Sequence, residues 1–157
     1  MLRKLLVFLL ASVSFAFNAT IGPLIDTHQE EAYFLMFETL AREDAEFIAV
    51  DLSGALLKDT SKLVEMMRAW CDEREIEFML DDWAGLDEKG LIEEDNGMIG
   101  WHYTVDGGLI RFSDVSLTRN TLVTNTGVAG SMAGYRTTIR RVFGKWVITE
   151  RKMTWIV

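Results

Sequence analysis

Residues 135–157 read YRTTIRRVFGKWVITERKMTWIV, and this stretch decides the fold class. Apolar and polar side chains alternate on both sides of Gly144, which is typical of two β-strands joined by a tight turn. Trp146 and Val147 then lie on opposite faces of the second strand. One face of the first strand carries the odd-numbered positions Tyr135, Thr137, Ile139 and Phe143. The pattern predicts a long C-terminal hairpin with both faces partly covered.

Working backward, the same alternation predicts three more strands, at 98–105, 109–117 and 121–126. Asp106, Gly107 and Gly108 stand between the first two strands and favour a hairpin turn there. Arg119 and Asn120 favour a second turn, and residues 127–134 form a glycine-rich connection to the last hairpin. We therefore expect an antiparallel meander of five strands.

Before residue 97 the apolar side chains recur mainly with the period of an α-helix. Thr27 and Glu30 have the capping-box spacing and predict a helix that runs to about residue 42. A second helix is expected over 61–72, where Leu63, Met67 and Trp70 lie on one stripe. Short strands are expected at 46–52 and 76–80, and a short helix at 83–89. The fold class is therefore α+β, with two main helices and short strands followed by the meander, which packs on the helices.

The ending 134–157, with G-K-W at its turn and T-W-I near its end, resembles the last hairpin of small exported bacterial domains of unknown function. The similarity extends through F-I-A-V-D-L at 47–52 and D-T-S-K-L-V at 59–64, and it implies no known activity. The hairpin also resembles, more weakly, that of cystatin-like and nuclear-transport-factor-like (SnoaL-like) cone domains. This second resemblance implies a small-ligand pocket.

Residues 1–16 predict a secretory signal peptide. Arg3 and Lys4 precede an apolar run, and Ser14 and Ala16 occupy the −3 and −1 positions of a cleavage site. The apolar run ends at residue 17, which is too short for the about 20 residues of a spanning helix. A retained anchor and a buried first helix are the alternatives. We expect cleavage, export to the periplasm or outside the cell, no stable membrane span afterwards, and a single domain over 17–157.

Charge divides the chain into two parts. The formal net charge is −8, residues 26–95 hold 21 acidic and 6 basic residues, and residues 96–157 hold 3 acidic and 8 basic residues. One interpretation is that an acidic helical layer neutralises a basic sheet. The other is a basic strip for an anionic ligand or partner, made of Arg136, Arg140, Arg141, Lys145, Arg151 and Lys152. Nucleic acid is not expected as a partner, because an acidic chain is repelled by phosphate.

Reactive side chains are few. His102, between Trp101 and Tyr103, is the single catalytic candidate, as a proton carrier in a pocket. A hydrogen-bonded structural role is its alternative. Cys71, the only cysteine, falls on the apolar stripe of the second helix and is expected to pack there. Two histidines without helical spacing predict no zinc site, the acidic residues of 81–95 lack the order of a calcium loop, and no cofactor is expected.

Three functions fit these observations. We expect an exported soluble module that binds an unknown protein or small molecule, because no catalytic constellation is evident. The alternatives are a cone-type pocket enzyme or small-ligand carrier that uses His102, and an envelope immunity or inhibitor protein. For the binding module the expected contact residues are Trp101, Tyr103, Arg136, Arg140, Arg141, Lys145 and Trp155.

Overall fold

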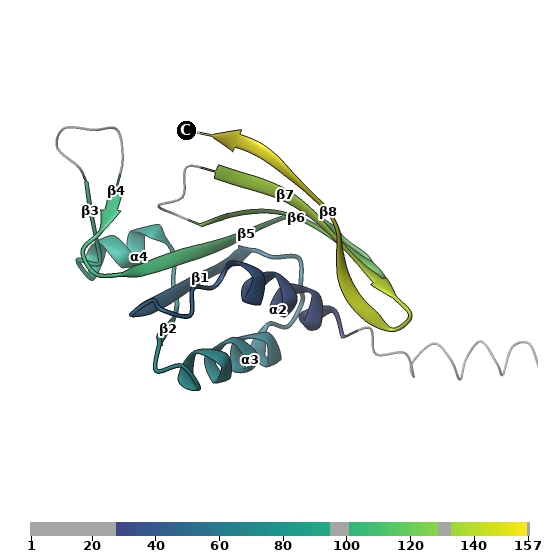
Figure 1. Ribbon diagram of the computed structural model, residues 1–157, viewed down its shortest axis with the longest axis horizontal. Helices are drawn as coiled ribbons and strands as arrows, with labels where there is room; N and C mark the ends of the chain where they lie inside the picture. The colour runs from purple at the N-terminus through teal and green to yellow at the C-terminus, as the bar shows by residue number, and fades with distance from the viewer. Residues whose placement is uncertain (1–27, 95–100, 129–132, 157) are drawn as a thin grey trace, which may run out of the picture.

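The structure is a computed structural model that describes residues 28–94, 101–128 and 133–156 (Figure 1). The expected signal peptide lies outside these residues. The elements, in chain order, are α2 (Gln29–Leu40), β1 (Phe47–Gly54), α3 (Ser61–Asp72), β2 (Glu77–Leu80), α4 (Trp83–Glu88), β3 (Ile92–Glu94), β4 (Trp101–Tyr103), β5 (Gly107–Leu117), β6 (Thr121–Val128), β7 (Ala133–Val142) and β8 (Lys145–Ile156). No helix of this described part is long and apolar enough to cross a membrane.

The strands form a six-stranded sheet in the order β2-β1-β5-β6-β7-β8 and a separate two-stranded sheet of β3 and β4. β1 pairs in parallel with both β2 and β5, and the pairs from β5 to β8 are antiparallel. Helices α2 and α3 lie below the β1–β5 part of the sheet in Figure 1, while α4 and the β3–β4 hairpin gather at one end. The expected α+β class is confirmed.

The predicted five-stranded meander is wrong in its first strand. Only β5 to β8 form a meander, and β4 pairs with β3 in the small sheet. Asp106, Gly107 and Gly108 do not form the predicted hairpin turn, because Gly107 begins β5 and lies opposite Phe47 of β1. A Cβ atom on Gly107 would lie 2.1 Å from the Phe47 ring. These glycines therefore permit close packing of two strands rather than a reversal of the chain.

The two main helices form where the sequence predicts them. On α3 the buried side chains are Leu63, Met67, Trp70 and Cys71, as the helical stripe indicates. Burial raises the pKa of the Cys71 thiol to about 11, so this side chain packs as a small hydrophobe. The N-cap of helix α2 is His28, in a left-handed conformation (φ 43°), so Glu30 stands at the second helical position and not at the third, where a capping box places it. Thr27, the predicted N-cap, lies outside the described residues.

The core lies on both faces of β1 and β5. Alternate β1 residues, Ile48 and Val50, face the helices and join the main core with Phe112 of β5. Phe47 and Ala49 face the other way, and join a smaller core beneath α4 and the small sheet. This two-sided burial explains why 47–50 is a continuous buried run rather than an alternating one.

The C-terminal hairpin joins β7 to β8 and is confirmed, with two differences. Phe143 lies in the turn at φ 49° and is fully exposed, so it does not share the buried face of Ile139 as predicted. The β7–β8 register also shifts twice, between Gly134 and Tyr135 and between Thr138 and Ile139, so β8 carries extra residues relative to β7. Trp146 is buried and its indole N–H donates to the His28 carbonyl at 3.0 Å, which fastens the hairpin to α2.

The Gly107 contact gives a first prediction. Gly107→Ala should lower the free energy of unfolding by about 1–3 kcal/mol, because the added methyl group overlaps a buried ring that has no room to move. Urea denaturation measures the change.

A double-mutant cycle with Phe47→Leu is the control. The smaller side chain should remove part of the penalty, so the two substitutions should not be additive. Strict additivity, or a change below about 0.5 kcal/mol for the glycine variant, would contradict the packing role of Gly107.

Candidate functional site

The predicted basic strip is divided between the two faces of the sheet. Ile139 is fully buried in the main core, so its neighbours Arg140 and Thr138 on β7 point to the opposite, outer face. Arg136 lies on that outer face as well, whereas Arg141 lies on the inner face beside Trp146. The six basic residues therefore do not form one continuous surface.

Arg136 and Arg140 share the outer face, and so does Lys145, because it lies opposite Val142 and next to the inward-facing Trp146. Arg136 is opposite Asn125 of β6 and Lys152 of β8, and its Nε donates to Asn125 Oδ1 at 3.1 Å. Arg140 is opposite Val147 of β8, which is 39% exposed. Neighbouring strands thus supply Asn125, Lys152 and Val147 to one surface, which we call the outer basic face together with the two arginines. Sequence reasoning missed Asn125 and Val147 because only the strand register brings them there.

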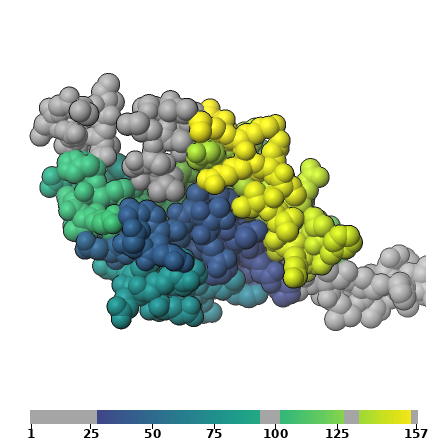
Figure 2. Space-filling model, in the orientation of Figure 1, coloured from purple at the N-terminus to yellow at the C-terminus, as the bar shows by residue number. Residues whose placement is uncertain are grey.

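The outer basic face is open. The two main helices pack on the inner side of the sheet, and Figure 2 shows the C-terminal strands, in yellow, forming one side of the molecular surface away from α3, in teal. Phe143, at the tip of the hairpin, is completely exposed beside Val142, which is 42% exposed. A flat strand face with separate apolar side chains and cations can contact a protein partner.

Arg136 and Arg140 form no close ion pair in the described part of the chain. No carboxylate there lies within 4 Å of Arg136 or Arg140, and Lys152 is the member that is paired, with Glu150 at 2.7 Å. That pair lowers the pKa of Glu150, with a smaller contribution from the more distant Arg140. Glu150 lies on the same face, opposite Thr138, so the face combines Arg136, Arg140 and Lys152 with one carboxylate and keeps a local positive charge.

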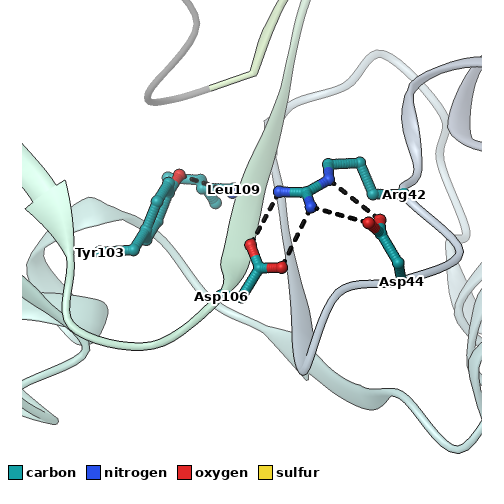
Figure 3. Close-up of polar contacts among 5 residues, drawn as sticks. All are labelled: Arg42, Asp44, Tyr103, Asp106 and Leu109. Carbon is teal, nitrogen blue, oxygen red and sulfur yellow. Dashed lines mark hydrogen bonds and ion pairs between the residues drawn. The ribbon is translucent and has the colours of Figure 1, made fainter.

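Basic residues of the acidic half behave differently, because most of them form ion pairs. Arg42, Lys62, Arg74 and Lys89 each have a carboxylate partner. Arg42 forms hydrogen bonds with both Asp44 and Asp106, and so connects the end of α2 to the loop before β5 (Figure 3). Ion pairs between the acidic and basic halves are few in the described ranges, so mutual neutralisation by direct contact accounts for little of the charge division.

Asp51 of β1 and Arg111 of β5 form an ion pair in which an acidic residue of the first half meets a basic residue of the second. Arg111 Nε donates to Asp51 Oδ2 at 2.8 Å, and the Asp51 side chain is only 5% exposed. Burial alone would raise the pKa of Asp51, but hydrogen bonds from Ser53 and the Arg111 guanidinium hold it below its ordinary value. This pair stabilises the β1–β5 contact.

Tyr103 has a structural role in the small sheet. Its hydroxyl accepts a hydrogen bond from the Leu109 N–H at 2.9 Å (Figure 3), and its ring meets the Phe47 and Trp83 rings edge to face. Burial raises the pKa of this hydroxyl. The backbone of Trp101 lies in β4, far along the chain from the outer basic face, and Trp155 lies in β8.

His102 is an exposed residue of the β3–β4 hairpin. Its Nε2 lies 3.8 Å from Glu93 Oε2, and the two side chains are 55% and 66% exposed. A shallow depression elsewhere is lined by Leu40, Ala41, Arg42, Ala45, Ile48, Gly108 and Ile110, and His102 is not among them. His102 is thus largely exposed and lies beside an exposed carboxylate.

Lys145 begins β8 next to the hairpin turn, opposite Val142. No group of three or more metal-ligating side chains is present among the residues described. Comparison with known proteins found no matching family model, no matching curated protein and no matching solved structure.

The Asp51–Arg111 pair gives a prediction about pH. Because the pKa of Asp51 is lowered in the folded state, its contribution is complete above the unfolded value of about 3.9 and is lost as the pH falls through the lower folded value. Asp51→Asn should therefore flatten the dependence of stability on pH between about 2 and 5. The same substitution should also lower the free energy of unfolding at pH 7 by about 1–3 kcal/mol.

Urea denaturation across the pH range measures both effects. Arg111→Gln is the matched variant, because it should raise the pKa of folded Asp51 toward the unfolded value and so make the loss of stability on acidification smaller. If wild type and both variants have the same pH profile, the pair does not stabilise the fold in this way.

Proposed function

We propose that the protein is an exported, non-enzymatic binding module whose outer basic face contacts an acidic surface of a partner protein. The observation that carries the proposal is that Arg136 and Arg140 lie exposed on the outer strand face and form no ion pair with a carboxylate in the described part of the chain. Exposed charges of this kind steer association and select a partner of opposite sign.

An acidic protein fits this face better than a nucleic acid. The whole chain has a formal net charge of −8, so it is repelled by a polyphosphate at long range. A protein partner of limited area experiences mainly the local charge of the outer basic face. Val147 and Phe143 add exposed apolar area beside the arginines. Aromatic and arginine side chains are enriched among the residues that dominate protein–protein binding.

Export rests on the sequence of residues 1–16, which carry the charged, apolar and small-residue regions of a signal peptide. In the periplasm or outside the cell the module would meet other exported proteins. The exposed position of His102 gives no specific support to the pocket-enzyme alternative.

The outer basic face can be tested with poly-L-glutamate as a probe of stated chemistry. Arg136→Gln combined with Arg140→Gln should weaken binding by at least about tenfold at low salt, because the exposed cations of the face are removed. It should also reduce the slope of log affinity against log salt concentration. Titration by fluorescence anisotropy over a salt series measures both quantities.

The control is Lys58→Gln combined with Arg68→Gln, which removes two charges from the α3 side and gives the same net charge. This control variant should bind within about twofold of wild type. An equal loss in both double variants would mean that net charge alone governs the binding. No saturable binding by wild type would contradict an anion-binding face.

A further inference from the structure

A line of polar residues crosses the inner face of the sheet, on the side where the helices pack. Asp114 of β5 is opposite Thr124 of β6, Thr124 is opposite Thr137 of β7, and Thr137 is opposite Arg151 of β8. Thr126 is two residues from Thr124 and so shares its face. The next line on this face is apolar, with Leu117, Leu122, Ile139 and Ile148. Polar groups thus interrupt an otherwise apolar inner surface.

The threonines of this line are buried, Asp114 is partly buried and Arg151 is exposed, and several of the buried polar atoms lack a partner. Thr137 is 0% exposed and Thr126 is 3% exposed, yet neither hydroxyl has a hydrogen-bond partner among the residues that the structure describes. Asp114 is satisfied at one oxygen, Oδ2, which accepts from the Tyr33 hydroxyl and from the Leu56 N–H at 2.7 Å. Its other oxygen, Oδ1, is buried and has no such partner. Buried polar atoms in folded proteins nearly always have partners, so three on one face indicate a site.

The spacing of the strands sets the size of what the site binds. Neighbouring strands lie about 4.8 Å apart, so Asp114 on β5 and Thr137 on β7 are separated by about 10 Å. One oxygen that is hydrogen-bonded to two groups at about 2.9 Å bridges at most about 6 Å. This separation is between the two backbones, with Thr124 between them, and two oxygens in series span more of it than one oxygen does. Thr126 lies on the same face beside them.

We propose that Asp114, Thr126 and Thr137 form a binding site for at least two linked, neutral hydroxyl-type oxygens. Asp114 Oδ1 can only accept, so the bound group donates there, while threonine hydroxyls both donate and accept. Two sources have this chemistry: a pair of ordered water molecules and a small polyol. The Tyr33 and Phe112 rings, 5.5 Å apart between centroids, lie beside the site and supply apolar surface for the carbon atoms of a polyol.

Threonine-methyl and hydroxyl NMR on the full chain tests the site, with glycerol as the polyol probe. If a polyol binds, the Thr126 and Thr137 methyl signals should shift saturably with glycerol. In the Thr126→Val, Thr137→Val variant the apparent affinity should fall at least tenfold. Thr138→Val is the matched control on the other face of β7, and it should leave the response unchanged.

If water is the source, glycerol should have no effect, and both threonine hydroxyls should show cross-relaxation with long-lived water in the wild-type protein. This measurement needs no variant, so it remains decisive if the valine variants fail to fold. The absence of both a saturable glycerol response and long-lived water at these hydroxyls would overturn the proposal. The site lies on the face opposite the outer basic face. A negative result in these NMR experiments would therefore leave the poly-L-glutamate result unaffected.

Discussion

The parallel pairing of β1 with β5 is the contact on which the rest of the structure depends. It joins the helical first half of the chain to the meander of the second half, and it is buried on both faces. The fit requires a glycine at 107, because the Phe47 ring occupies the space where a side chain would stand. Asp51 and Arg111 extend the same pairing with a charged hydrogen bond at its far end. Packing and electrostatics thus act on one pair of strands.

Local pattern predicted the elements well and their partners less well. The stripe of Leu63, Met67 and Trp70 predicted α3, and the alternation around Gly144 predicted the last hairpin. The glycines at 107 and 108 are compatible with either a turn or a close contact between strands, because both favour glycine. Only a partner that is 60 residues away in the chain, Phe47, distinguishes the two roles. Single-sequence patterns carry no information on such a distant contact.

The candidate surface was predictable in residue type but not in geometry. The basic residues of 136–152 were recognisable as a group, yet alternation along β7 sends Arg140 and Arg141 to opposite faces. Tyr103 packs against the smaller core and its hydroxyl accepts from the Leu109 N–H, while its expected role at a contact surface stays a prediction. The inner polar line was invisible in the sequence, because Asp114, Thr124 and Thr137 come together only through the register of three strands.

The two register shifts in the β7–β8 pair have a consequence for self-association. β8 is an edge strand, and a newly arriving strand would meet an interrupted backbone ladder with Lys145, Arg151 and Lys152 along it. Interruptions and lysines are known to discourage edge-to-edge polymerisation. The opposite edge, β2, offers only four residues. The chain can therefore present a broad strand surface at high concentration without growing into fibres from its longest edge.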